Sequence, residues 1–224
     1  MRFDSVRIHV ADLDAATGAY ELLLGVRASS RDGIQRLQLG RGAVELAHGE
    51  PVLHALRFVA TGDEAVAWPT ADGAFHGLCV RVGPLLDTGA PAASHDAVEA
   101  IDHVVIHSPD LDRARALWRD RLGLRLALDR EFPGRGLRML FFRSGGVTLE
   151  FVGTLAQPVD PGGPDCLYGI AYRVSGIEAC RARLLSGGLD VSTIRPGHKP
   201  GTWVAAVRSG TADVPTLLLS MTAG

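Results

Sequence analysis

The feature that most constrains the fold of this chain is an internal repeat. The segment "FDSVRIHVADLDAATGAYELLLG", residues 3–25, aligns without a gap with "IDHVVIHSPDLDRARALWRDRLG", residues 101–123. The early aspartate, the central Ile-His pair, the Asp-Leu-Asp sequence and the final glycine coincide in the two segments. Such self-similarity over a long period indicates a duplicated supersecondary unit. We therefore expect the 224-residue chain to be built from copies of one module.

Each copy reads as a strand, a helix and three further strands. In the second copy, residues 101–107 have the alternation of a strand, and residues 111–122 carry apolar side chains at helical spacing. Asp110 is the expected N-cap of this helix, and Gly123 is the residue expected to end it. The runs "LRLALDRE", "LRMLFFRS" and "VTLEFVG" follow as strands separated by turn sequences. The predicted module is therefore βαβββ.

Two further copies are less similar to the first pair. One is "LYGIAYRVSGIEACRARLLSGGLDVSTI" with two later strands, and the other lies in "VLHALRFVATG…HGLCVRVG", where the helix is weak or missing. A stretch rich in Pro, Gly, Ala and Ser separates the two pairs and reads as a linker. The predicted segments are an N-terminal half at 1–83 (module 1–50 and truncated module 51–83), a linker at 84–100, and a C-terminal half at 101–224 (modules 101–155 and 165–222).

The composition narrows the class of protein and its partners. The chain is 46% hydrophobic and 21% charged, as in ordinary globular proteins, and its net charge of −2 argues against a nucleic-acid partner. The three cysteines, Cys79, Cys166 and Cys180, form no CxxC pair, which favours a reducing compartment. The first residues are charged where a signal peptide would be apolar, and no run reaches the length of a membrane span. We expect a cytoplasmic protein with no membrane partner.

The module sequence resembles the vicinal oxygen chelate superfamily, most clearly in "IDHVVIHSPDLDRA…WRDRLGL" followed by "GVTLEFVG". Members of this superfamily include glyoxalase I, methylmalonyl-CoA epimerase, extradiol dioxygenases, and the fosfomycin and bleomycin resistance proteins. The resemblance implies an α+β glyoxalase/bleomycin resistance/dioxygenase fold, in which tandem βαβββ modules pair into curved eight-stranded sheets. It also implies a divalent metal in the cleft, held by His or Gln from the first strand and Glu from the fourth strand of each module.

The third module matches this ligand pattern at His103 and Glu150. Strand side chains alternate between two faces, so His103 points away from its apolar neighbours Val104 and Ile106. Glu150 likewise points away from the apolar residues that flank it. A His and a carboxylate on one surface are suitable ligands for Fe²⁺, Mn²⁺, Ni²⁺ or Zn²⁺. The alternative is a hydrogen-bonded core histidine without a metal.

The other modules match the pattern incompletely. Ser5 stands at the histidine position of the first module, and Gly169 and Leu218 replace both ligands of the fourth. Glu45 in the first module and His54 in the second do match. Each half therefore offers two of the four ligands that the resemblance implies.

Two interpretations of this count remain open. In the first, both halves have lost a working metal site, and a metal is absent. In the second, the second and third modules pair, and His54 joins His103 and Glu150 as a set of two histidines and one carboxylate.

Four further side chains are candidates for roles in catalysis or binding. Glu45 or His107 is the candidate acid–base group, although a surface role at the strand end is the alternative for His107. Arg7 and Arg173 are candidates for binding an anionic substrate, because a guanidinium binds a carboxylate through two bonds. The alternative for both arginines is an internal ion pair with Glu45 or another acid.

The sequence thus leaves three functional hypotheses. The first is a metal-dependent isomerase, lyase or dioxygenase acting on a small oxygenated, anionic molecule. The second is a metal-free small-molecule binding protein of the bleomycin-resistance type. The third is a structural or assembly role, which predicts a homodimer.

Overall fold

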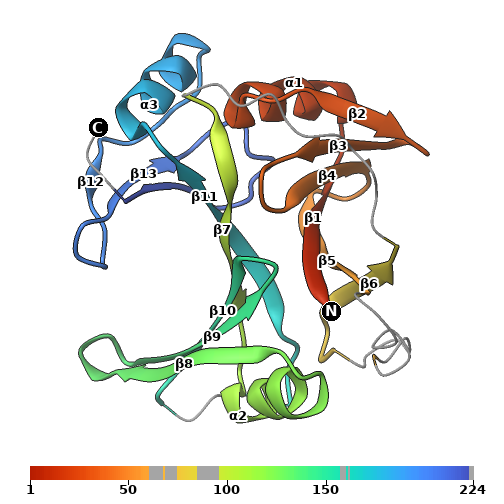
Figure 1. Ribbon diagram of the computed structural model, residues 1–224, viewed down its shortest axis with the longest axis vertical. Coiled ribbons are helices and arrows are strands. Elements are labelled where there is room, and N and C mark those ends of the chain that lie inside the picture. Colours follow the sequence, from red (N-terminus) through yellow and green to blue (C-terminus); the bar gives the residue numbers. More distant parts are fainter. Residues whose placement is uncertain (61–67, 69–74, 85–95, 157–159, 161, 222–224) are drawn as a thin grey trace. The chain divides into compact units, whose positions relative to one another are not determined.

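The computed structural model describes residues 1–60, 68, 75–84, 96–156, 160 and 162–221 (Figure 1). These residues form two mixed sheets and a few helices, which confirms the predicted α+β class and the fold that the resemblance implied. Within the same residues, no helix has the length and apolar character needed to cross a bilayer.

The first sheet contains the strands of the N-terminal part of the chain. Its elements are β1 (Arg2–Val10), α1 (Leu13–Leu24), β2 (Ala28–Arg31), β3 (Ile34–Gln38), β4 (Ala43–His48), β5 (Val52–Val59) and β6 (Cys79–Gly83). The strand order is β2-β3-β4-β1-β5-β6, with β1 parallel to β4 and β5 parallel to β6. Six strands are described here rather than eight, because the second module contributes only β5 and β6 to this part of the structure.

The second sheet has the predicted eight strands. Its elements are β7 (Val98–His107), α2 (Leu111–Arg115), η2 (Ala116–Arg121), β8 (Arg125–Phe132), η3 (Pro133–Arg135), β9 (Leu137–Ser144), β10 (Val147–Thr154), β11 (Cys166–Val174), α3 (Ile177–Ser186), β12 (Arg195–Pro196), β13 (Trp203–Val207) and β14 (Thr216–Ser220). The order β12-β13-β14-β11-β7-β10-β9-β8 places the first strands of the third and fourth modules next to each other. β7 begins three residues before the predicted strand, within the predicted linker.

The helices begin and end where the sequence predicts. The side chains of Asp12 and Asp110 accept hydrogen bonds from the backbone of the first turn of α1 and α2. Each helical segment is followed by a glycine, Gly25 or Gly123, with a φ of 71°, a conformation that favours glycine. The single helix predicted in the third module differs in one respect, because its last six residues form the π-helix η2.

The chain packs into two compact units, and each unit takes one module from each half. Unit 1 holds most of the second and third modules, and unit 2 holds most of the first and fourth. Their segments are Met1–Asp4, Ala55–Leu85 and His103–Tyr168 for unit 1, and Ser5–His54, Leu86–Asp102 and Gly169–Gly224 for unit 2. The two sheets thus follow the predicted halves, whereas the compact units cut across them. The domain boundaries given by the sequence remain a prediction.

Unit 1 has an aromatic core centred on Trp118, which is fully buried. The ring centroids of Phe58, Trp68, Phe75 and Phe151 lie 6.0, 6.1, 5.7 and 5.6 Å from that of Trp118. Trp68 and Phe75 come from between β5 and β6, where the other modules have a helix. Both rings contribute to the core around Trp118.

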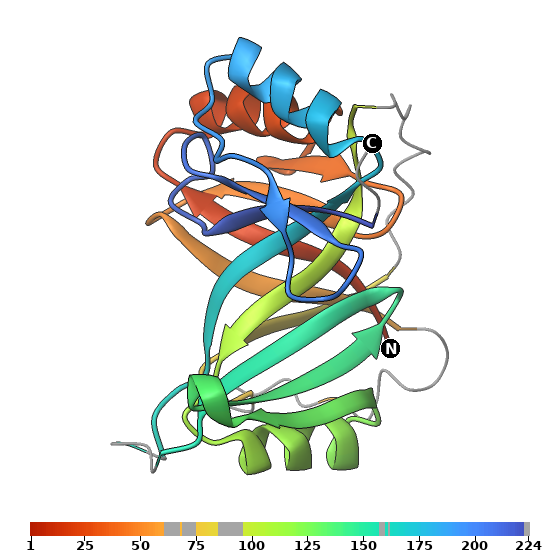
Figure 2. The ribbon, with the colours of Figure 1, turned by 90° about the vertical axis from the view of Figure 1, so that its left-hand side faces the viewer.

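Unit 2 is covered by α1 and α3, which lie side by side (Figure 2). Arg183 of α3 donates hydrogen bonds to the backbone carbonyls of Leu22 and Leu23 at the end of α1. These carbonyls have no acceptor role left inside the helix, so a cationic donor there is favourable. The buried Tyr20 hydroxyl of α1 donates to the carbonyl of Thr211 at 2.8 Å.

Candidate functional site

His103 and Glu150 lie on β7 and β10, which are neighbouring parallel strands of unit 1. His103 is paired with Thr148 and Val105 with Glu150, so the two ionisable side chains point to the same side of the sheet. Nε2 of His103 lies 3.9 Å from Oε2 of Glu150, and their side chains are 18% and 16% exposed. The structure therefore brings these two residues together in a position that solvent reaches.

The other side of the same strands is apolar and buried. Its residues pack beneath the helical segment α2–η2, which lies against β9 and β10 (Figure 1). The buried side chains on this side are Val104, Ile106, Leu149 and Phe151. A shift of either strand by one residue would bury His103 or Glu150 and expose this set, so the hydrophobic pattern fixes where the pair points.

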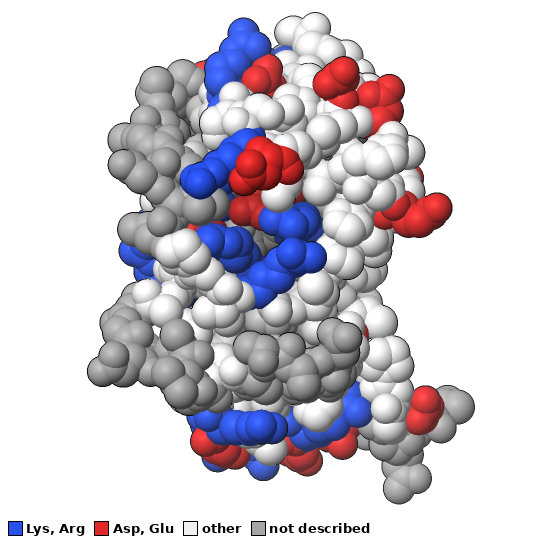
Figure 3. Space-filling model, turned by 90° about the vertical axis from the view of Figure 1, so that its right-hand side faces the viewer, with Lys and Arg blue, Asp and Glu red and all other residues white. Residues whose placement is uncertain are grey.

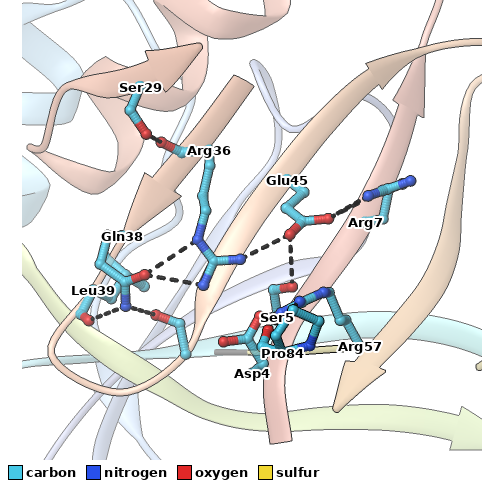
Figure 4. Close-up of polar contacts among 11 residues, drawn as sticks. Asp4, Ser5, Arg7, Ser29, Arg36, Gln38, Leu39, Glu45, Arg57 and Pro84 are labelled. Atoms are coloured by element: carbon cyan, nitrogen blue, oxygen red, sulfur yellow. Dashed lines mark hydrogen bonds and ion pairs between the residues drawn. The ribbon is translucent and has the colours of Figure 1, made fainter. Parts of the chain in front are cut away.

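In the first module, Glu45 of β4 occupies the position equivalent to Glu150 and has different neighbours (Figure 4). Oε1 of Glu45 accepts from Nη1 of Arg36 at 2.7 Å and from the hydroxyl of Ser5 at 3.1 Å. Oε2 accepts from Nη2 and Nε of Arg7 at 2.7 and 3.1 Å. Glu45 is only 2% exposed. Both carboxylate oxygens are therefore held by guanidinium groups in a buried cluster, which we call the Glu45 cluster (Ser5, Arg7, Arg36 and Glu45).

This environment does not suit the acid–base role predicted for Glu45. A general base needs an accessible lone pair, and here each oxygen already accepts charge-assisted hydrogen bonds. The structure instead shows the alternative considered for Arg7, an internal ion pair with Glu45.

The strand register explains why the two glutamates differ. On the first strand of the module, the residue paired with the glutamate is Arg7 in the first module and Val105 in the third. On the third strand, the paired residue is Arg36 in the first module and Phe141 in the third. Two arginines thus stand where the third module has two apolar side chains. The carboxylate at this position is ion-paired with two arginines in the first module and lies beside a histidine in the third.

The structure supports the equivalence of Gly169 with His103, because Ser5, His103 and Gly169 each stand eight residues before the first residue of the following helix. The register changes the equivalent of Glu150 by one residue. His103 pairs with Thr148, two residues before Glu150, whereas Ile170 pairs with Thr216, so Gly169 lies at the level of Pro215 and the equivalent of Glu150 is Leu217 rather than Leu218. Alternation alone did not reveal this shift, because it required the pairing of β11 with β14.

The fourth module has no metal donor at either ligand position. It carries Gly169 and Leu217 there. Gly169 is also unable to carry a larger side chain, because a Cβ atom there would lie 2.6 Å from the carbonyl oxygen of Pro215.

A duplicated ion pair aligns the second module with the fourth. Arg57 pairs with Asp4, and Arg173 pairs with Asp102, which is the equivalent of Asp4 in the repeat. The two arginines are thus equivalent. Gly169, at the histidine position of the fourth module, precedes Arg173 by four residues, and the same spacing from Arg57 leads to Leu53. His54 lies one residue after that position.

His54 lies in unit 2, where its ring stacks on that of His9 at a centroid distance of 3.8 Å. His103 lies in unit 1, so the role of His54 as a third ligand remains a prediction. Among the residues that the structure describes, no group of three or more His, Cys, Asp or Glu side chains is placed to hold a metal ion.

The two arginines predicted to bind substrate each have an internal acidic partner. Arg173 is ion-paired with Asp102 and is 34% exposed, and Arg7 is ion-paired with Glu45 and is 14% exposed. Both guanidinium groups remain partly open to solvent. Their predicted role in binding an anion is compatible with this exposure but is not tested by it.

His107, the second predicted acid–base residue, lies at the end of β7 and stacks on Tyr168. The ring centroids are 4.3 Å apart and the rings are nearly parallel. Burial lowers the pKa of His107 below the usual 6.5 of a histidine. Its imidazole is therefore neutral near neutral pH, which is the form that accepts a proton.

The lowered pKa of His107 predicts a loss of stability in acid. The unfolded chain binds a proton near pH 6.5, before the folded protein does, so stability falls as the pH drops through 6.5 to the folded pKa. Melting curves between about pH 8 and about pH 5 should show a smaller decrease for His107→Phe, which keeps the stack on Tyr168. An unchanged decrease in this variant would mean that other groups carry the effect.

Sequence reasoning missed Arg36 and Arg57. Arg36 lies in the short strand "IQRLQ", and only its pairing with Glu45 shows that its side chain is buried against a carboxylate. Arg57 could have been found, because a charged residue inside the apolar run "VLHALRFV" requires a partner.

The surface charge is mixed on the face shown in Figure 3, where Asp and Glu side chains lie among the Lys and Arg side chains. This mixture fits a net charge of −2. A nucleic-acid-binding surface would instead gather basic side chains on one face.

Comparison with known proteins agrees with this architecture. Residues 102–205 match the family model described as the glyoxalase/bleomycin resistance protein/dioxygenase superfamily. An ethylmalonyl-CoA/methylmalonyl-CoA epimerase of Cereibacter sphaeroides is 29% identical over 101 residues, covering 41% of this chain and 72% of that protein. The crystal structure of the Mn(II)-bound glyoxalase from Novosphingobium aromaticivorans superposes with a TM-score of 0.73 at 19% identity, covering 98% of this chain and 82% of that one. The last similarity extends over both halves of the chain.

Proposed function

Because the chain belongs to the vicinal oxygen chelate superfamily, we propose that it is a divalent-metal-dependent isomerase or lyase acting on a small oxygenated molecule. The observation that carries this proposal is the approach of His103 and Glu150 to 3.9 Å on one side of the second sheet. An epimerase and a manganese-bound glyoxalase among the similar proteins support this reaction type.

The donor chemistry of the pair fits a divalent cation. Imidazole nitrogen and carboxylate oxygen bind such metals at about 2.1 Å, so two ligands at an angle of about 90–110° lie about 3.0–3.4 Å apart. The observed separation of 3.9 Å requires only a small side-chain movement. Val105 and Phe141, which pair with Glu150, bring no charge that would compete with the metal for the carboxylate.

In this proposal His103 and Glu150 hold the metal, and His54 is the third ligand predicted from the sequence. A bound metal would act as a Lewis acid and stabilise negative charge on a substrate oxygen. His107, with its neutral imidazole, is the group proposed to accept a proton from the substrate. The proposed homodimer and the identity of the metal are not needed for this assignment.

The proposal predicts a metal that depends on the pair. Protein purified without chelators is expected to contain a divalent metal, measured by elemental analysis after loading with Mn²⁺, Fe²⁺, Ni²⁺ or Zn²⁺. His103→Ala and Glu150→Gln should weaken binding by at least about tenfold, because each removes a direct ligand. His48→Ala, a change at an exposed histidine of β4, is the matched control and should retain the metal. A wild-type protein that binds none of these metals would disprove the proposal.

The same measurement decides the role of His54. Loss of metal in His54→Ala would support a site of two histidines and one carboxylate. Retention of the metal in this variant would mean that groups other than His54 complete the coordination of the metal by His103 and Glu150.

A metal-free binding protein of the bleomycin-resistance type is the second candidate. It is favoured by the two-residue donor set of the described structure and by the neutralised carboxylate of the Glu45 cluster. This candidate predicts that small molecules raise the melting temperature of chelator-treated protein.

A further inference from the structure

We propose that the Glu45 cluster is a second, metal-free ligand site, at which Arg7 binds the carboxylate or phosphate group of a small molecule. This inference does not rest on the proposed metal site in unit 1. It concerns unit 2, where Ser5 stands at the histidine position and Glu45 is ion-paired with Arg7 and Arg36.

The hydrogen bonds of Arg7 leave one edge of its guanidinium available. A guanidinium has five N–H donors in a planar fork. Arg7 directs Nε and Nη2 to one oxygen of Glu45, at 3.1 and 2.7 Å. Among the described residues, Nη1 has no hydrogen bond to an acceptor. The edge formed by Nη1 and Nη2 therefore has the geometry that binds an oxyanion through two parallel bonds.

Exposure decreases from the edge of the cluster to its centre. The side chains of Arg7, Arg36 and Glu45 are 14%, 7% and 3% exposed, and Ser5 is fully buried. An anion arriving from solvent thus meets Arg7 first. Partial burial weakens competition from water and strengthens the attraction between opposite charges.

The position of the cluster in its module also indicates a ligand site. Arg7 and Arg36 pair with Glu45 in the same register in which Val105 and Phe141 pair with Glu150. The module that carries the arginines also has a serine in place of the histidine. Fixed guanidinium charge thus replaces the His–Glu pair, and such a site favours direct anion binding over metal-mediated binding.

Binding of the anion should be saturable and should depend on Arg7. EDTA-treated protein is titrated with acetate, succinate or inorganic phosphate, and chloride at equal ionic strength serves as the reference. The melting temperature of the protein and the heat of binding are measured. The wild type is expected to show one saturable site and a rise in melting temperature. Arg7→Gln should weaken binding by at least about tenfold, because it removes a charge-assisted pair of hydrogen bonds. Arg27→Gln changes an exposed arginine that is also ion-paired, and it should bind as the wild type does.

Two additional variants separate binding from folding. Arg7→Lys keeps the charge but lacks the planar fork, so it should fold and bind the anion more weakly. Arg7→Gln/Glu45→Gln removes both charges together and should fold without binding. The inference is overturned if the anions stabilise the wild type no more than chloride does, or if Arg7→Lys binds as tightly as the wild type. Repeating the titration with His103→Ala shows that the result is independent of the metal proposal.

Discussion

Replacing Arg36 by methionine is expected to lower the free energy of unfolding by about 3–5 kcal/mol, because it leaves a buried carboxylate without one of its cations. Arg36 is 6% exposed and donates to Oε1 of Glu45 at 2.7 Å. It also donates to the side-chain oxygen of Gln38 at 3.0 and 3.3 Å, so the substitution removes several hydrogen bonds at once. Urea unfolding followed by circular dichroism measures the change.

The control is Glu150→Gln, at the position of the third module that is equivalent to Glu45. Glu150 is partly exposed, and its 3.9 Å contact with His103 is longer than a hydrogen bond. Its replacement should change stability by less than about 1 kcal/mol in the absence of metal. A loss below about 1 kcal/mol for Arg36→Met would show that the buried ion pair does not stabilise the fold.

The fold was predictable because individual residues with a structural role recur at equivalent positions of the internal repeat. Asp110 and Gly123 mark the ends of one helix and coincide with Asp12 and Gly25 in the other copy, so capping and repeat support the same boundaries. The weaker similarity of the second module limited the prediction. Most of the segment in which the sequence predicts a weak or missing helix lies outside the described residues.

The side of the sheet to which His103 and Glu150 point was also predictable. In each strand the alternating residues are apolar and must face the core, so the ionisable side chain points the other way. The equivalence of Leu217 with Glu150 was not predictable, because it depends on which residues of β11 and β14 are paired. The burial of Arg36 was hidden for a similar reason. Its strand is short and polar, and its partner Glu45 is known only from the register of β3 and β4.

The two modules with a glutamate show how one position acquires two different properties. In the first, Arg36 and Arg7 neutralise Glu45, and the carboxylate becomes part of the folded framework. In the third, the equivalent side chains are apolar, and Glu150 is left beside His103 with access to solvent. Because a carboxylate already paired with two cations attracts no third, we assign the proposed metal chemistry to the third module only.

Replacing Trp118 by alanine is expected to lower the free energy of unfolding by about 3–5 kcal/mol, because it opens a large cavity in the core of unit 1. Trp118 is fully buried, and its ring contacts the rings of Phe58 and Phe151 as well as those of Trp68 and Phe75. Thermal and urea unfolding measure the loss. Hydrogen exchange should show faster opening of the segments that pack on this residue than of unit 2.

Trp118→Phe separates the effect of packing from that of the indole N–H. Nε1 of Trp118 is buried without a hydrogen-bond partner among the described residues, and an unpaired donor of this kind destabilises by about 1–3 kcal/mol. Phenylalanine removes that donor and keeps most of the aromatic contact, so the two effects oppose each other. We expect this variant to lose less than about 1.5 kcal/mol, far less than Trp118→Ala. Equal losses in the two variants would mean that the stabilisation depends on the indole itself, rather than on the packing of an aromatic ring.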